Sequence, residues 1–142
     1  MNVYFSCSIT GGRNEEKTYQ AIVNAMLSWG HIVPTAHLSR PEVTELENVV
    51  EPIEIFQRDI TWLMECDAVV AEVSSPSHGV GYEIAYALNL GKPVLCCYQE
   101  GKRVSKIITG NMNPTITIKT YVSDEDAIEV VRDFLLAQPS HF

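Results

Sequence analysis

The stretch DAVVAEVSSPSHGVGYEIAYALNLGKPVLCCY, residues 67–98, contains the smallest unit that decides the fold. Residues 67–73 and 93–98 are short apolar runs of the kind that form buried strands. Between them, GVG (79–81) opens an apolar segment of helical length, and Gly91 follows its end, as glycines often do at helix C-termini. Two successive parallel strands need a crossover connection, usually a helix. This unit therefore predicts an α/β fold built on a parallel sheet.

The rest of the chain continues the same alternation of short strands and helices. Further strands are predicted at 2–8, 31–34 and 115–121, further helices at 13–29, 52–66, 102–109 and 124–137, and a polar loop without a clear period at 35–48. We expect one domain over residues 1–142. Its fold would be a doubly wound, mostly parallel five-stranded sheet with helices on both faces, of the flavodoxin or Rossmann-like type. Ligands of such sheets bind beyond the carboxyl ends of the strands.

Composition and charge exclude several classes of function. The 142 residues are 46% hydrophobic and 20% charged, as in a globular protein rather than a disordered one. A net charge of −8 without any basic run disfavours binding to duplex nucleic acid. No apolar run reaches the roughly 18 residues of a membrane span, and the N-terminus lacks the basic start of a signal peptide. We therefore expect neither a membrane nor a duplex as partner.

The cysteines and histidines point to a reduced protein without a metal. Cys7, Cys66, Cys96 and Cys97 lie in or beside apolar segments and form no CxxC pair. This pattern predicts buried free thiols in a reducing compartment. The four histidines show no HExxH or other metal-binding spacing, so no metal site is expected.

One aspartate occupies the centre of an apolar helical stripe. When the predicted helix 52–66 is drawn at about 100° per residue, Ile55, Leu63 and Cys66 lie within roughly 40° of Asp59. An unpaired charge in such a place is costly. Asp59 therefore caps a neighbouring loop, pairs with a buried arginine, or serves in a functional site. It is the strongest purely physical signal in the chain.

A second acid, Glu83, opens the apolar helix that follows GVG. It could stabilise the helix end as a cap, bind ribose hydroxyls, or act as a catalyst. Because its helix is almost wholly apolar, we expect that helix to be largely buried and Glu83 to face a partner or a cleft. Glu72, near the end of the strand at 67–73, is a third candidate, for which a structural role is favoured. Two such acids could divide the work of glycosidic cleavage between attack and proton donation.

Two glycine-containing loops follow predicted strands. TGGR (10–13) comes after the first strand, and SSPSHGVG (74–81) comes after the strand at 67–73. Exposed amides at a helix N-terminus suit an anion, and Ser75 and Ser77 add hydroxyl donors. Neither loop matches the Walker motif or the GxGxxG fingerprint. By themselves, these loops indicate only a candidate anion site.

Four segments, in chain order, resemble those of the 2′-deoxynucleoside 5′-phosphate N-hydrolases, within the nucleoside 2-deoxyribosyltransferase superfamily. They are YFSCSITGGR, FQRDITWLMECDAVVAEV, SSPSHGVGYEIAYAL and VLCCY, and the resemblance runs from residue 3 to about residue 110. It implies an enzyme that, without a cofactor, cleaves the N-glycosidic bond of deoxynucleoside monophosphates. The products would be a free base and 2-deoxyribose 5-phosphate. An intracellular location, in the cytoplasm and the nucleus, is expected.

The resemblance implies catalytic roles for three residues. Glu83 matches the glutamate of GVGYE, which is the nucleophile, and Asp59 matches the aspartate that assists protonation and orientation. Tyr4 matches a tyrosine beside the active site. Glu83 would form a glycosyl-enzyme that water then hydrolyses, as in retaining glycosidases.

The resemblance also implies substrate contacts and a partner. Ser77 and Gly79 would hold the 5′-phosphate, and Ser105, in SKIITG, would reach the phosphate from a neighbouring subunit. The protein would then be a homodimer whose active sites are completed across the interface. Thr10 stands where the family has an arginine, which is expected to alter base preference or local charge. The remaining residues expected near the substrate are Ile9, Thr10, Gly11, Arg13 and His37.

Three other functions stay open. A deoxyribosyltransferase would pass the same intermediate to a second base, and a ribonucleotide N-hydrolase would accept the 2′-hydroxyl. A non-catalytic nucleotide-binding module would use its acids only to bind ribose hydroxyls. Dependence on a 5′-phosphate and the absence of base exchange would favour the N-hydrolase.

Overall fold

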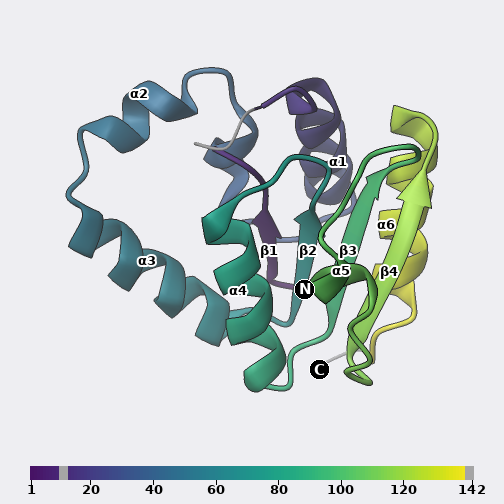
Figure 1. Ribbon diagram of the computed structural model, residues 1–142. Helices are drawn as coiled ribbons and strands as arrows, with labels where there is room; N and C mark the ends of the chain where they lie inside the picture. Colours follow the sequence, from purple (N-terminus) through teal and green to yellow (C-terminus); the bar gives the residue numbers. More distant parts are fainter. Residues whose placement is uncertain (10–12, 140–142) are drawn as a thin grey trace.

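The computed structural model describes residues 1–9 and 13–139. Within these residues, a parallel sheet of four strands forms the centre of the molecule (Figure 1). The strands are β1 (Val3–Ser6), β2 (Ala68–Glu72), β3 (Val94–Gln99) and β4 (Ile116–Tyr121), in the spatial order β1-β2-β3-β4. Since neighbouring strands are parallel, their connections cross over through helices. The α/β fold that the sequence predicts is confirmed.

Helices cover both faces of this sheet. The bounds are α1 (Glu16–Ser28) and α6 (Asp124–Leu136) on one face, and α3 (Pro52–Glu65), α4 (His78–Asn89) and α5 (Lys106–Thr109) on the other (Figure 1). The side chains of β1 alternate between the two cores, as strand geometry requires. Val3 and Phe5 pack with α1, whereas Tyr4 packs with α3 and α4. Tyr4 therefore lies on the side of the sheet that carries both candidate acids.

The fifth strand predicted at 31–34 does not form. Ile32 makes a single parallel bridge beside β1, where its carbonyl oxygen accepts an N–H of that strand at 2.8 Å. Pro34 has no N–H to continue the ladder. The next bond at this edge is made by a side chain, since the Thr35 hydroxyl oxygen accepts the N–H of Phe5 at 2.9 Å. The segment lies where a fifth strand would lie, but the prediction of a strand is wrong.

The polar loop predicted at 35–48 contains two short helical segments. They are the 3₁₀ turn η1 (Ala36–Ser39) and the helix α2 (Val43–Asn48). Glu47 of α2 is tied to α3 by an ion pair with Arg58. Helices this short depend on tertiary contacts rather than on their own propensity, and no periodic pattern marks them. The prediction of an irregular loop is wrong for most of this segment.

The helix α4 is less buried than its apolar composition predicts. Val80, Ile84 and Ala87 form one buried stripe at helical spacing, whereas Tyr82 is 53% exposed. Gly91 follows the helix with a φ of +74°, the left-handed conformation that glycine adopts readily. The predicted helix end is confirmed, but the expectation of a largely buried helix is wrong.

The four cysteines are free and buried, as predicted. Burial raises the pKa of Cys7 and of Cys96 to about 12, so these thiols stay protonated at neutral pH. None of the helices formed by the described residues combines the length and the apolarity that a membrane span requires.

Candidate active site

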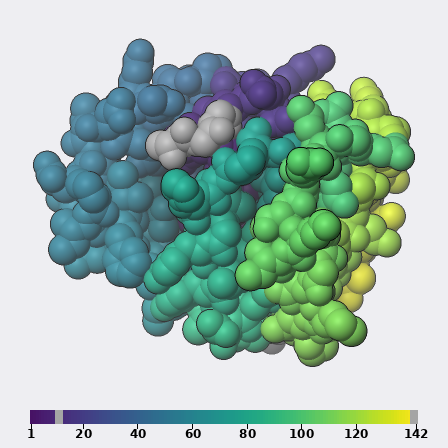
Figure 2. Space-filling model, in the orientation of Figure 1, coloured from purple at the N-terminus to yellow at the C-terminus, as the bar shows by residue number. Residues whose placement is uncertain are grey.

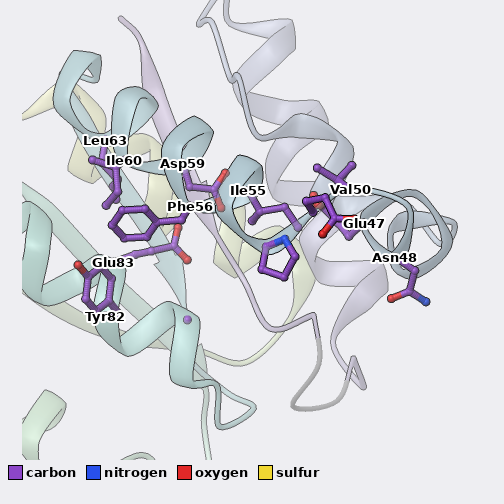
Figure 3. A pocket seen from close by; sticks show the side chains of 13 residues that line it. Glu47, Asn48, Val50, Ile55, Phe56, Asp59, Ile60, Leu63, Tyr82 and Glu83 are labelled. Carbon is purple, nitrogen blue, oxygen red and sulfur yellow. The ribbon is translucent and has the colours of Figure 1, made fainter.

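A cavity of about 580 Å³ lies between α3, α4 and the segment that contains α2. Figure 2 shows the α2–α3 segment (blue) beside α4 (teal), and Figure 3 shows the side chains that line the cavity. Its volume is in the range of sites for small organic ligands. The lining residues are Val50, Pro52, Ile55, Phe56, Ile60, Leu63 and Tyr82, the polar Glu47, Asn48, Glu51, Asp59 and Glu83, and Gly79.

Glu83 lies at one end of this cavity and is held by two hydroxyl groups of β1. The Tyr4 hydroxyl donates to Oε2 of Glu83, and the Ser6 hydroxyl donates to Oε1 at 3.4 Å. Tyr4 and Ser6 are two positions apart on one strand, so both point toward α4. The helix begins at His78 with Ser77 as its N-cap. Glu83 therefore lies beyond the first turn and is not the cap.

The electrostatic setting of Glu83 favours a carboxyl group that titrates near neutral pH. Burial, to which the negative charge of Asp59 adds, raises the pKa of Glu83 to about 7, although the hydrogen bonds from Tyr4 and Ser6 act in the opposite direction. Burial and the charge of Glu83 raise the pKa of Tyr4 far above its usual range, so that its hydroxyl remains a donor. An ionised Glu83 is a carboxylate in a largely apolar setting, which suits attack on an electron-poor carbon.

Asp59 faces the same cavity from α3 with a side chain that is 20% exposed. Its Oδ1 accepts a hydrogen bond from Nε of Arg58 at 2.9 Å. Burial raises the pKa of Asp59, and the hydrogen bond and charge of Arg58 oppose that rise. The apolar stripe around Asp59 is shared between the cavity, which Ile55 and Leu63 line, and the buried core, to which Leu63 and Cys66 belong. The two acids singled out in the sequence therefore meet at one cavity (Figure 3).

The N-terminus of α4 places two further predicted residues close to Glu83. The Ser77 hydroxyl oxygen accepts the N–H of Val80 at 3.3 Å, which leaves its own O–H able to donate elsewhere. A Cβ added to Gly79 would lie 3.8 Å from Oε1 of Glu83 and 3.9 Å from Oγ of Ser77. The first amides of a helix have no intrahelical acceptor and attract anions. An anion bound at Gly79 would thus lie next to Glu83.

Ser105 lies in a second cavity, of about 380 Å³, between the N-terminus of α4 and α5. Ser77, His78 and Arg103 line the same cavity. Ser105 precedes α5, and its side chain makes no capping hydrogen bond there. Within one chain, the structure therefore brings Ser105 together with Ser77 but not into the cavity of Glu83.

The other predicted site residues lie away from the main cavity or outside the part of the chain that the structure describes. Arg13 donates to two backbone carbonyl oxygens, at 3.1 and 3.3 Å, and so ties down the chain after β1. Ile9 packs against the core on the α1 face. His37 is linked to the cavity through Glu47, whose Oε1 lies 3.1 Å from its Nε2. The predicted residues that lie outside the described part of the chain are Thr10 and Gly11.

The sequence left four residues of this site unidentified. Ser6 could have been found, because it shares the side of β1 on which Tyr4 lies. Arg58 stands next to Asp59 in the chain, which was a usable signal for an ion pair. Glu47 could not have been found, since α2 was not predicted. Tyr82 gave no signal, because an aromatic residue on an apolar helix is usually a core residue.

The third acidic candidate, Glu72, belongs to a buried structural network. Its carboxylate accepts the N–H of Ser74 at 2.5 Å and the hydroxyl of Tyr121 at 2.7 Å. The Ser75 hydroxyl donates to the buried carboxylate of Glu15 at 2.7 Å. These bonds fix the segment that leads into α4 from two sides. The structural role favoured for Glu72 agrees with this arrangement.

A comparison with family models decides the relationship of the chain. The model described as nucleoside 2-deoxyribosyltransferase matches residues 3–129. The chain belongs to the nucleoside 2-deoxyribosyltransferase family. The resemblance inferred from the sequence motifs is thus confirmed.

Individual relatives of this deoxyribosyltransferase-family chain include N-hydrolases by name. A protein of Tetraodon nigroviridis named 5-hydroxymethyl-dUMP N-hydrolase is 38% identical over 143 residues, which covers 97% of this chain and 99% of that protein. A protein of Nematostella vectensis, named provisionally as a 2′-deoxynucleoside 5′-phosphate N-hydrolase, is 41% identical over 137 residues, with coverage of 93% and 92%. The solved structure of a CMP N-glycosidase from Clostridium botulinum superposes with a TM-score of 0.72 at 18% identity, covering 94% of this chain and 99% of that one. That last likeness shows the fold alone.

Proposed function

We propose that this family member hydrolyses the N-glycosidic bond of 2′-deoxynucleoside 5′-monophosphates, giving a free base and 2-deoxyribose 5-phosphate. One observation carries the proposal: Glu83, hydrogen-bonded by the Tyr4 hydroxyl, faces the same cavity as Asp59. Glycosidic cleavage uses such a pair of carboxyl groups. The names of the Tetraodon and Nematostella relatives support N-hydrolysis of a deoxynucleotide. The proposed reaction uses no cofactor.

In the first step, Glu83 acts as the nucleophile. Oε1, which the Ser6 hydroxyl holds only at 3.4 Å, attacks C1′ of the deoxyribose. The C1′–O bond forms as the C1′–N bond breaks, and the electron pair of the C1′–N bond leaves with the base. Asp59, whose pKa burial raises, supplies or shares the proton that the departing base takes up. The product of this step is a glycosyl ester of Glu83.

In the second step, water regenerates the enzyme. The oxygen of a water molecule attacks C1′, the ester C1′–O bond breaks, and its electron pair returns to Glu83 as a carboxylate. The proton that the water loses goes back to Asp59, which restores the starting state. The Tyr4 hydroxyl supports both steps, because its hydrogen bond stabilises the ionised form of Glu83.

The 5′-phosphate binds at the N-terminus of α4 in this proposal. The free O–H of Ser77 and the backbone amides around Gly79 are its donors. Gly79 is important because a side chain there would occupy space between the phosphate and Oε1 of Glu83. Contacts to this non-reacting group supply binding energy and orientation for the chemical step.

The proposal includes a homodimer in which Ser105 of one subunit approaches the phosphate bound by the other. Exposed apolar side chains around the second cavity support it, since Ile107 is 81% exposed and Tyr82 is 53% exposed. Such side chains often mark protein interfaces. Mixing a Glu83→Gln variant with a Ser105→Ala variant tests it: shared sites restore activity in mixed dimers, whereas sites confined to one subunit give no gain.

Residues 1–142 act as one domain inside the cell, in the cytoplasm or the nucleus, in the same proposal. The four buried free thiols support a reducing compartment. Microscopy of the tagged protein tests this location.

The decisive experiment is base release from a panel of deoxynucleoside monophosphates by the wild type and by Glu83→Gln. We expect the wild type to release base and the variant to lose at least about a thousandfold of that activity. The exposed acid Glu54 of α3 provides a control, since Glu54→Gln removes a carboxylate that does not line the cavity. Acid quenching followed by intact mass measurement should detect a deoxyribose phosphate adduct on wild type only. Full activity in Glu83→Gln would refute the nucleophile.

The same assay separates the alternatives. Transfer of deoxyribose from an unphosphorylated nucleoside to an added second base would indicate a deoxyribosyltransferase. Equal cleavage of dGMP and GMP would indicate a nucleotide N-hydrolase that ignores the 2′-hydroxyl. Tight binding of a nucleotide that is recovered intact after long incubation would indicate a binding module.

A further inference from the structure

Arg58 joins Asp59 to a second carboxylate of the cavity wall. Its Nε donates to Oδ1 of Asp59 at 2.9 Å. Its Nη2 and Nη1 donate to the two oxygens of Glu47 at 2.9 and 3.4 Å. Both acids line the main cavity. The guanidinium therefore uses three of its donors to hold two acids from two different helices, which its planar fork allows and an ammonium group does not.

Further contacts fix the place of this guanidinium. Its carbon lies 4.9 Å from the ring centre of Trp62, one turn further along α3. Oε1 of Glu47 also lies 3.1 Å from Nε2 of His37, and the His37 and Trp62 rings make a T-shaped contact with their centroids 6.1 Å apart. The side chain of Arg58 is 25% exposed, and that of Glu47 is 10% exposed. The guanidinium is thus held by residues of α2 and α3, and His37 of η1 contacts two of them, Glu47 and Trp62.

Asp59 is surrounded by charged and titratable groups from every neighbouring element. Arg58 lies on its own helix, Glu47 on α2, His37 on η1, and Glu83 on α4 with Tyr4 of β1 behind it. In the described part of the chain, Arg58 is the only lysine or arginine that pairs with Asp59 or with Glu47. Oδ1 of Asp59 is occupied by Arg58, and Oδ2 makes no hydrogen bond with another described residue. One carboxylate oxygen thus stays open to a ligand.

We propose that Arg58 is a positioning residue. It holds Asp59 by the hydrogen bond to Oδ1, so that Oδ2 faces the departing base, and its own position is fixed by Glu47. This inference rests on the proposed function, because it assigns to Asp59 the handling of the proton of the base. Arg58 acts through Asp59 and does not contact the reacting atoms. Glu47 and His37 act one step further away, through the placement of the guanidinium.

Arg58 and Glu47 act on the pKa of Asp59 with opposite signs. The hydrogen bond and positive charge of Arg58 lower the pKa of Asp59, while the negative charge of Glu47 raises it. Arg58→Gln should therefore raise the pKa of Asp59, and Glu47→Gln should lower it. If the ion pair served only to hold α2 against α3, both substitutions would loosen the same contact and shift the pKa of Asp59 in the same direction.

A carboxyl-carbon NMR titration distinguishes these possibilities without using activity. The Asp59 signal is assigned by its absence from Asp59→Asn, and it is then followed against pH in the wild type, Arg58→Gln and Glu47→Gln. Arg132→Gln is the matched control, because Arg132 likewise lies 4.9 Å from a tryptophan ring and pairs with a glutamate at 2.7 Å, but on α6. We expect the pKa of Asp59 to rise in Arg58→Gln, to fall in Glu47→Gln and to stay unchanged in Arg132→Gln. An unchanged titration in Arg58→Gln, or shifts of the same sign in both variants, would overturn the inference.

Steady-state kinetics tests the geometric half of the proposal. Arg58→Gln should lower kcat by about tenfold or more with little change in KM, since general acid–base catalysis contributes on the order of 10²- to 10⁴-fold and only its positioning is lost. Arg58→Lys keeps the charge but loses the fork, so that the titration of Asp59 should stay near that of the wild type while kcat remains reduced. A wild-type kcat in Arg58→Lys would refute the positioning role. This variant also keeps the test valid if Arg58→Gln fails to fold.

The failure of this inference can be told apart from the failure of the proposed function. If the wild type releases no base from any deoxynucleoside monophosphate, the proposed function fails, while the NMR titration still reports whether Arg58 controls Asp59. If base is released but Arg58→Gln and Arg58→Lys retain the wild-type kcat, only the role of Arg58 is wrong.

Discussion

The hydroxyl of Tyr4 should control the pH at which Glu83 becomes active. Tyr4→Phe removes the donor to Oε2 and keeps the ring, which is fully buried, so the packing of the sheet is preserved. A hydrogen bond to a charged group contributes about 1.5–3 kcal/mol, which corresponds to roughly one to two pKa units. Because the wild-type pKa of Glu83 is about 7, nearly half of the enzyme carries an ionised nucleophile at pH 7. In Tyr4→Phe that share falls to about a tenth or less, and kcat/KM at pH 7 should fall about 5- to 50-fold.

The assay is kcat/KM for base release measured from pH 5.5 to 10. The loss of kcat/KM in Tyr4→Phe should shrink at alkaline pH, because Glu83 is ionised there in the variant as well. The acidic limb of the profile moves to higher pH. Tyr19→Phe is the control. Tyr19 is equally buried, but it lies on the α1 face of the sheet, and its hydroxyl has no hydrogen-bond partner among the described residues.

The reasoning is refuted if Tyr4→Phe loses the same factor at pH 7 and at pH 9.5. Such a result would mean that the hydroxyl orients the substrate or the carboxylate without controlling its ionisation. A profile shifted equally in Tyr19→Phe would show that any buried hydroxyl has this effect, and would equally remove the special role of Tyr4.

Three further predictions concern stability and the phosphate end of the site. The raised pKa of Glu83 means that its contribution to stability is fully present below the unfolded-state pKa of 4.5 and is lost as the pH rises through about 7. In urea unfolding at pH 8.5, Glu83→Gln should therefore have a free energy of unfolding up to about 3 kcal/mol above that of the wild type, with a much smaller difference at pH 4; equal differences at both pH values would contradict the burial effect. Ser77→Ala should cost about 1 kcal/mol of unfolding free energy through the lost N-cap and raise KM for a nucleotide more than for a nucleoside; a parallel rise for both ligands would argue against phosphate binding there. Gly79→Ala should fold normally, since its Cβ would meet only ordinary contacts at 3.8 and 3.9 Å, yet raise KM about tenfold by filling the space beside Glu83; an unchanged KM would place the phosphate elsewhere.

The sequence predicted those parts of the fold that depend on local pattern. Four strands and the helices α1, α3, α4, α5 and α6 follow from apolar runs, helical periods and the glycine at position 91. The strand expected at 31–34 failed because Pro34 and the Thr35 hydroxyl replace the ladder, an event that depends on the neighbouring strand. The helix α2 was missed because tertiary contacts such as the pair between Glu47 and Arg58 support its few residues.

The candidate site followed a similar division. Glu83 and Asp59 were visible because each is a charge in an apolar helix, and burial makes such a charge costly. Tyr4 came from the family resemblance, although its neighbour Ser6 was within reach of the strand period. The connection of Asp59 to Glu47 through Arg58 could not be predicted, because it joins segments that only the folded chain brings together.

The hydroxyl of Thr35 at the edge of the sheet has a consequence for thermal behaviour. β1 carries both groups that hold Glu83, yet among the described residues its outer edge is hydrogen-bonded only to the carbonyl oxygen of Ile32 and to this one side chain. Local opening of a sheet edge costs less free energy than unfolding of the whole domain. Fraying there would withdraw Tyr4 and leave the carboxyl group without its donor while the helices remain intact. We therefore expect activity to be lost at a lower temperature than helical structure.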